Sequence, residues 1–176
     1  NFAKMNSHGN DFIVIDTTNN EFQQTQETIK KICSRENIGC DQLLLIDPTN
    51  PSQIHCKIYN QDATEAKQCG NGLRALMLYL SKKFGLNKSS IKICDKIYDV
   101  SIIDEENIKV DMGPPEFPID EDFFSKFVSD KKEVQIHLSS KKNHFGITVG
   151  TNDDNWSFAF MPVFIGNLHC VVVSQN

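Results

Sequence analysis

The chain has 176 residues, of which 39% are hydrophobic and 23% charged, and its formal net charge is −5. This composition is ordinary for a folded protein, and the length allows one large domain or a domain and a half. The acidic balance argues against a nucleic-acid partner, and no stretch approaches the roughly 18 consecutive apolar residues of a membrane helix. We therefore expect neither nucleic acid nor membrane as a partner.

Runs rich in β-branched and aromatic residues, bounded by turn residues, predict strands on both sides of one long helix. The predicted strands of this part are Phe2–Met5, Phe12–Ile15, Leu43–Ile46, Ile54–Tyr59, Ile91–Cys94, Tyr98–Ile103 and Ile108–Met112. A shorter helix is expected to begin after its N-cap Thr25 and to be broken by Gly39. The predicted class is α/β, in the mixed α+β sense.

The long helix is predicted from apolar residues that share one helical face. They are Leu73, Leu76, Met77, Leu80 and Phe84. Cys69 therefore lies at the helix N-terminus, where unpaired N–H groups and the helix dipole favour an anion. We expect this position to lower the pKa of the Cys69 thiol toward neutrality and to make it a nucleophile or a base. The alternative is a small buried cysteine that caps a helix, but the Gly-Asn-Gly directly after Cys69 favours chemistry.

Gly113-Pro114-Pro115 can neither continue a strand ladder nor start a helix, so we place a domain boundary there, between 1–113 and 114–176. A polar stretch with Phe123, Phe124 and Phe127 is expected to form a helical turn or two. The strands predicted after it are Val134–Leu138, Phe145–Val149, Ser157–Phe164 and Cys170–Val173. These elements are too few to close a core alone, which predicts an incomplete, β-rich second domain.

The six cysteines have irregular spacing, with no Cys-x-x-Cys pair and no regular Cys/His pattern. We therefore expect no metal site. The five cysteines other than Cys69 are interpreted as reduced packing residues in a cytoplasmic protein.

Five motifs, in order, resemble those of the diaminopimelate epimerase family. They are Lys4-Met5 with Gly9–Phe12, Gly39–Leu44, Asn60–Arg74, Val110–Gly113 with Pro115, and Gly166–Val172. The resemblance implies two similar α/β halves, each with strands wrapped round a central helix, and a substrate cleft between them. It also implies cofactor-independent inversion of an α-carbon between LL- and meso-diaminopimelate. Such inversion needs a base on one face of the carbon and an acid on the other, which a thiolate and a thiol can supply.

By this resemblance Cys69 is the catalytic thiol of the first half, and His169 tunes the thiols. The implied substrate contacts are Asn10, Gln42, Asn60, Gly70, Asn71 and Asn167. The implied partner is a small amino-acid substrate, with no cofactor, and the full-length form is expected to be a homodimer. Each of these residues also has a structural interpretation. The asparagines are equally well turn residues, Gln42 can be a solvated residue at a strand edge, and His169 can be a buried core histidine.

Departures from the family pattern leave alternatives open. Ala63 stands where the family has glycine. If that position needs a positive φ, the alanine is expected to shift the backbone. The second-half cysteine motif is not among the 176 residues, so we expect a fragment that is inactive alone. The alternative is a truncated, non-enzymatic protein of the same fold that binds a ligand or another chain. Proline-racemase-like and phenazine-pathway isomerases share the architecture, but their motifs fit less well.

Overall fold

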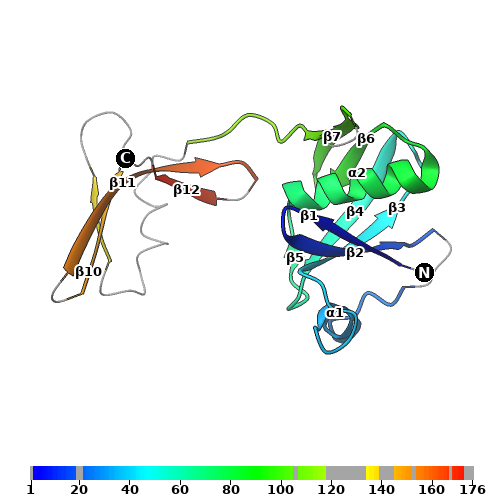
Figure 1. Cartoon of the computed structure of the whole chain (residues 1–176), viewed down its shortest axis with the longest axis horizontal. Coiled ribbons are helices and arrows are strands. Elements are labelled where there is room, and N and C mark those ends of the chain that lie inside the picture. The colour runs from blue at the N-terminus through cyan, green and yellow to red at the C-terminus, as the bar shows by residue number, and fades with distance from the viewer. Residues whose placement is uncertain are drawn as a thin grey trace. The chain divides into compact units, whose positions relative to one another are not determined.

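The structure, a computed structural model, describes residues 2–18, 22–104, 107–117, 134–138, 145–151, 154–166 and 168–172 (Figure 1). The chain divides into two compact units, Asn1–Gly113 and Pro114–Asn176. Each unit is described by itself below.

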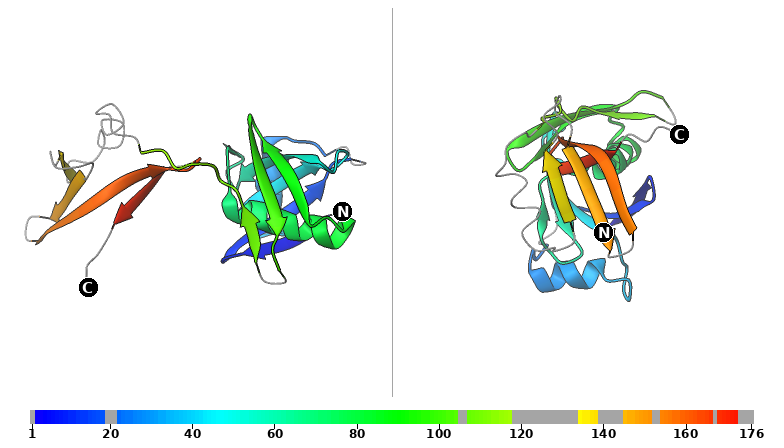
Figure 2. Two further views of the ribbon diagram at one scale, coloured as in Figure 1. Left: turned by 90° about the horizontal axis from the view of Figure 1, so that it is seen from above. Right: turned by 90° about the vertical axis from the view of Figure 1, so that its left-hand side faces the viewer.

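The first unit is built on one mixed sheet that curls round a helix. Its strands are β1 (Ala3–Ser7), β2 (Asn10–Asp16), β3 (Gln42–Asp47), β4 (Gln53–Asn60), β5 (Glu65–Ala66), β6 (Lys88–Ile93), β7 (Lys96–Ile102) and β8 (Ile108–Val110). Their order is β1-β2-β3-β4-β6-β7-β8, with β5 paired to β4. The outermost strands, β1 and β8, both contact helix α2 (Gly70–Phe84), so the sheet wraps round it (Figure 2, left). The predicted strands and their wrapping round a central helix are confirmed, whereas the short β5 was missed.

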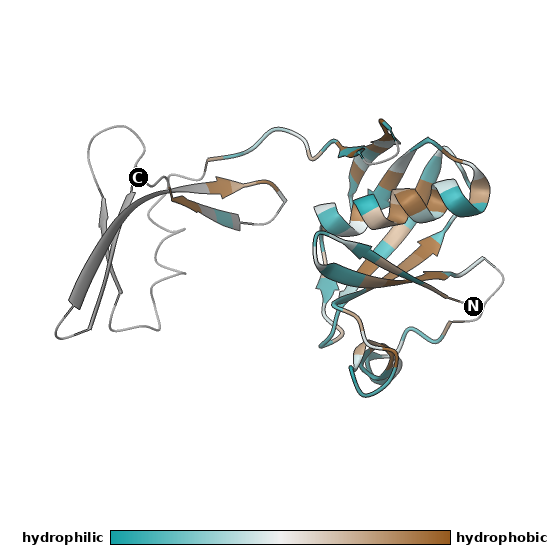
Figure 3. Ribbon diagram, viewed as in Figure 1, coloured by the Kyte–Doolittle hydropathy of each residue, from teal (hydrophilic) through white to brown (hydrophobic). Residues whose placement is uncertain are grey.

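The two helices lie on opposite faces of the sheet (Figure 1). Buried residues of α2, including Leu76, Met77 and Leu80, pack against Phe12 and Val14 of β2 and their neighbours. Helix α1 (Gln26–Cys33) covers the other face, through Ile29 and Cys33. Hydrophobic and hydrophilic residues alternate along α2 in Figure 3, as expected for a helix with one buried side.

The predicted helix ends are correct for α2 and for the start of α1. Cys69 is the N-cap of α2, and Gly85 ends it in the left-handed conformation with φ 69°. Thr25 caps α1, and its side chain accepts a hydrogen bond from the backbone N–H of Thr28. The prediction that Gly39 breaks α1 is wrong, because the helix already ends at Cys33, where Ser34 turns into an extended conformation. Gly39, with φ 73°, instead makes the later turn toward β3.

The hairpin between β1 and β2 places Asn10 at the start of its strand. Ser7 pairs with Asn10, which leaves His8 and Gly9 as a two-residue loop. Both have positive φ, 53° and 87°. This is the geometry of a type I′ turn, whose twist matches that of the strands it joins.

The second unit contains an antiparallel sheet in the order β12-β11-β10-β9. Its strands are β9 (Val134–Leu138), β10 (Phe145–Thr151), β11 (Asp154–Phe164) and β12 (Leu168–Val172). The β-rich character predicted for this part is confirmed, with β10 to β12 differing from the predicted bounds by a few residues. The predicted helical turn at Phe123, Phe124 and Phe127 lies outside the described residues. Over the described parts of the chain, no helix is long and apolar enough to cross a membrane.

Candidate active site

Three predicted contact residues lie at one end of the first sheet, on the face that carries α2. Gln42 pairs with Phe12 of β2 on one side and with Asn60 of β4 on the other. Phe12 belongs to the core under α2, and side chains alternate between faces along a strand. Gln42 and Asn60 therefore project toward α2, and Asn10, two residues before Phe12, does so as well.

Cys69 caps α2 at this same end. The N–H of Gly72 donates to the Cys69 sulfur at 3.2 Å, and the sulfur is partly buried. Gly72 also lies close to Phe12. A Cβ on Gly72 would come within 3.3 Å of the Cys69 sulfur and 3.4 Å of the Phe12 ring. The helix start, the thiol and strand β2 are therefore packed so closely that a methyl group on Gly72 would require its neighbours to shift by a few tenths of an ångström.

Burial raises the pKa of the Cys69 thiol above its ordinary value, and the N–H groups of Gly72 and Asn71 only partly offset this effect. The prediction that the helix terminus lowers this pKa toward neutrality is wrong here. The physical reason is that the apolar surroundings disfavour the charged sulfur more than two N–H donors favour it. Burial in this unit therefore favours the neutral thiol of Cys69 over the thiolate.

Side-chain amides form pairs at the same end of the sheet as Cys69. The Asn71 Nδ2 donates to Asn10 Oδ1 at 2.7 Å, which joins the first turn of α2 to the start of β2. The Gln42 Nε2 donates to Asn60 Oδ1 at 2.8 Å, and Asn60 Nδ2 donates to Thr64 Oγ1 at 3.0 Å. These bonds hold four of the six predicted substrate-contact residues as two pairs at one end of the sheet.

Gly70, a fifth predicted contact residue, is the first residue of α2. The sixth, Asn167, lies outside the described residues. His169 belongs to the second unit, on β12, where it pairs with Val163 and its side chain is exposed.

The loop between β4 and β5 shows that position 63 has a positive φ, but alanine adopts it there rather than shifting the backbone. Ala63 has φ 67°, the left-handed conformation that glycine adopts without cost. Its N–H donates to the Asn60 carbonyl at 2.9 Å, and its side chain is buried against the face that α1 covers. The alanine therefore keeps the turn that presents Asn60, at the cost of some backbone strain.

The charged residues behind the amides are not among the site residues predicted from the sequence, which favours a turn anchor for Asp11 and a structural pair or cap for Arg74. Arg74 donates to Asn71 Oδ1 at 3.1 Å, and Asp41 accepts from Asn10 Nδ2 at 3.4 Å. Arg35 in turn binds Asp41 and Asp11. Their signal in the sequence is that Asp11, Asp41 and Arg74 fall within the family motifs Gly9–Phe12, Gly39–Leu44 and Asn60–Arg74.

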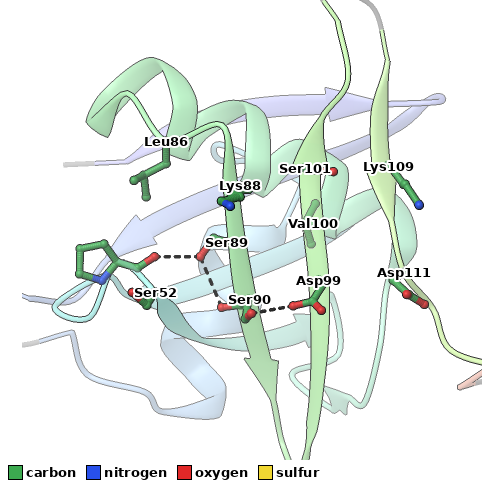
Figure 4. A pocket seen from close by; sticks show the side chains of 11 residues that line it. Ser52, Leu86, Lys88, Ser89, Ser90, Asp99, Val100, Ser101, Lys109 and Asp111 are labelled. Atoms are coloured by element: carbon green, nitrogen blue, oxygen red, sulfur yellow. Dashed lines mark hydrogen bonds between the residues drawn. The ribbon is translucent and has the colours of Figure 1, made fainter.

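A hollow of about 620 Å³ lies elsewhere in the first unit (Figure 4). Its lining residues come from the chain just before β4 and from the region of β6, β7 and β8. Two of them are hydrogen-bonded, Ser90 Oγ donating to Asp99 Oδ1 at 2.6 Å. Leu86, just beyond the C-terminal end of α2, also lines it. This hollow is therefore at the opposite end of α2 from Cys69. In the described part of the chain, no group of three or more His, Cys, Asp or Glu residues is arranged to hold a metal.

The curled sheet round α2, with a thiol at the start of that helix, defines a protein of epimerase-like fold. A structure described as a predicted epimerase from Pseudomonas aeruginosa matches it with a TM-score of 0.60 at 14% identity, over 97% of this chain and 58% of that one. The family model for diaminopimelate epimerase matches residues 2–118, and the chain belongs to the diaminopimelate epimerase family.

Sequence relatives agree with this assignment. The diaminopimelate epimerase of Blochmanniella floridana is 36% identical over 99% of this chain and 59% of its own length. That of Blochmanniella pennsylvanica is 32% identical over 99% of this chain and 60% of its own length. The chain thus spans about 60% of the length of these curated relatives.

Proposed function

We propose that this protein is an isomerase that interconverts LL- and meso-diaminopimelate by cofactor-independent proton transfer between two thiols. Cys69 is one of these thiols. The observation that carries the proposal is the partly buried thiol at the start of α2, with paired amides of Asn10, Asn71, Gln42 and Asn60 at the same end of the sheet.

The chemistry needs one thiolate and one thiol on opposite faces of the α-carbon. The thiolate takes the α-hydrogen as a proton, while the thiol gives its proton to the other face, so a C–H bond breaks and another forms. In one direction Cys69 acts as the thiol and gives its proton to the α-carbon as the other thiolate removes the α-hydrogen from the opposite face. In the reverse direction the resulting thiolate, held by the Gly72 N–H, takes the proton back. The second thiol comes from the other half of the family fold.

The remaining groups bind the amino-acid end of the substrate. The N–H groups at the start of α2, beginning at Gly70, favour the substrate carboxylate through the helix dipole. The side-chain amides of Asn10, Gln42, Asn60 and Asn71 offer both donors and acceptors to a zwitterion. By family resemblance Asn167 adds a further contact, and His169 tunes the thiols.

The product of this reaction is a precursor of lysine and of peptidoglycan. The family resemblance supports a cytoplasmic location and a homodimeric full-length enzyme, with these 176 residues supplying the first thiol and not the second. We therefore expect this stretch to be inactive alone.

The proposal is tested with the protein made from the complete gene. Incubated with LL-diaminopimelate in deuterated water, without pyridoxal phosphate or metal, it is expected to form the meso isomer and to place deuterium on the α-carbon. Mass spectrometry and chiral chromatography measure both results. Absence of both deuterium exchange and the meso isomer would overturn the proposal and favour the alternative of a non-enzymatic protein of the same fold.

Replacing Gly72 by alanine is expected to lower kcat/KM by roughly 10–100-fold, because the new methyl group displaces the sulfur and small misplacements of reacting groups are costly. Gly70→Ala is the comparison, since its Cβ meets only Met112 atoms at 3.6–3.7 Å, and a smaller loss is expected there. Steady-state kinetics of both variants decide the matter. Full kcat/KM in Gly72→Ala contradicts the placement of the thiol.

A further inference from the structure

Arg35 lies just beyond α1 and joins two carboxylates that stand at the starts of β2 and β3. Its guanidinium binds Asp11 through both nitrogens, with Nη1–Oδ2 at 2.6 Å and Nη2–Oδ1 at 2.8 Å. Nη2 also donates to Asp41 Oδ1 at 2.7 Å. The planar fork of arginine suits such a bridge, and lysine cannot reproduce it.

The two carboxylates clamp the strands that carry Phe12 and Gln42. The Asp41 N–H donates to Asp11 Oδ1 at 2.9 Å, and the Asp11 N–H donates to Asp41 Oδ2 at 3.0 Å. Each acid therefore accepts from the backbone of the other. This exchange fixes the neighbouring ends of β2 and β3.

The same network continues to the substrate-contact amides of the proposed site. Asp41 Oδ2 accepts from Asn10 Nδ2 at 3.4 Å, and Asn10 Oδ1 accepts from Asn71 Nδ2 at 2.7 Å. Arg74 donates to the oxygen of Asn71 at 3.1 Å. An unbroken polar chain thus runs from Arg35, beyond α1, to the first two turns of α2.

Electrostatics make Arg35 the critical member of this chain. Two carboxylates that exchange backbone hydrogen bonds repel each other unless cations neutralise them. Of the two acids, Lys4 binds Asp11, at 2.7 Å, and it also donates to the Gly39 carbonyl, whereas Arg35 binds both acids. Its hydrogen bond is the largest influence on the Asp11 carboxyl, whose pKa lies far below its ordinary value. Among the described residues, Arg35 is the cation that pairs with Asp41, so without it the Asp41 carboxylate is held by the Asp11 N–H and the Asn10 amide and carries an uncompensated charge.

We propose that Arg35 is a positioning residue that orients the Asn10 and Asn71 amides for substrate binding. Arg35 itself does not contact the substrate. The inference rests on the proposed epimerase function for its kinetic consequence, but the orientation of the two amides can be observed without it.

The test compares Arg35→Met, Arg35→Lys and Lys83→Met in the protein from the complete gene. Lys83 is a matched control, because it pairs with Asp16 at 2.8 Å, with similar exposure of both partners, at the opposite end of β2. We expect Arg35→Met to raise the KM for diaminopimelate about tenfold or more, with a smaller change in kcat, since it disturbs binding groups. Arg35→Lys is expected to restore part of the loss, and Lys83→Met to leave KM within about twofold.

A second measurement separates positioning from simple stabilisation. In ¹⁵N-labelled protein, the side-chain amide signals of Asn10 and Asn71 are expected to shift in Arg35→Met and to stay in place in Lys83→Met. Unchanged amide signals, or an equal rise of KM in Lys83→Met, overturn the proposal. If Arg35→Met does not fold, Arg35→Lys takes its place. Shifted Asn10 and Asn71 amide signals in that variant then support the proposal, and unchanged signals overturn it.

These experiments distinguish failure of the proposed epimerase function from failure of the positioning role of Arg35. If the unmodified complete protein does not epimerise diaminopimelate, that function is lost, and the amide signals alone judge the role of Arg35. If the unmodified protein is active and Arg35→Met keeps its KM, the function stands and the positioning role is lost.

Discussion

Replacing Cys69 by serine is expected to reduce kcat of the complete enzyme by roughly 10²–10⁴-fold, the usual contribution of a positioned acid or base. This equals about 3–5 kcal/mol of activation free energy. Serine is similar in shape and offers an oxygen in place of the sulfur that caps the helix, but it is far too weak an acid to donate its proton to a carbanion-like centre. The helix cap survives, because serine is itself a favoured N-cap residue.

Epimerisation rate and deuterium incorporation at the α-carbon measure this effect. Cys94→Ser is the control, since Cys94 is exposed in the turn after β6, near Glu65 rather than the amide pairs. We expect that variant to keep its activity. Undiminished turnover and exchange in Cys69→Ser remove Cys69 from the mechanism.

The largest expected effect on stability comes from Phe12→Ala. Phe12 is completely buried in the core between β2 and α2, and its ring also approaches Gly72. Removing a buried aromatic side chain costs about 3–5 kcal/mol, through lost burial and the cavity left behind. That is a large part of the roughly 5–15 kcal/mol that stabilises a typical protein.

Urea unfolding followed by circular dichroism at the helix wavelength measures this loss, because both described helices lie in the first unit. Phe2→Ala is the matched control, since Phe2 is 53% exposed and a change there is expected to stay within about 0.5 kcal/mol. Equal stability of the two variants contradicts the packing of β2 against α2.

Local signals explain why much of the first unit could be predicted. The apolar spacing from Leu73 to Phe84 predicts a helix that ends before Gly85, and α2 runs from Gly70 to Phe84. Alternation along Ile54–Tyr59 likewise predicts the half-buried β4. The end of α1 was misplaced because Ser34 turns out of the helix before the glycine signal at Gly39 is reached.

Part of the candidate site could likewise be predicted from the sequence, and part could not. That Cys69 begins a helix followed from its neighbours alone, and the family motifs marked Asn10, Gln42, Asn60 and Asn71. Their pairing did not follow, because Asn71 and Asn10 are 61 positions apart and meet only through the packing of α2 on β2. The positions of Asn167 and His169 relative to Cys69 stay predictions.

The sequence by itself determined the two helices, most of the strands, the cysteine at the start of α2 and the family resemblance, because each depends on residues close together in the chain. Only the tertiary structure decided the burial of Cys69 and the link from Arg35 to Asn71. Burial is set by whatever packs over the sulfur, and it raised the pKa that the helix terminus alone was expected to lower. Ion pairs and amide bonds between distant residues likewise exist only once the sheet has curled round its helix.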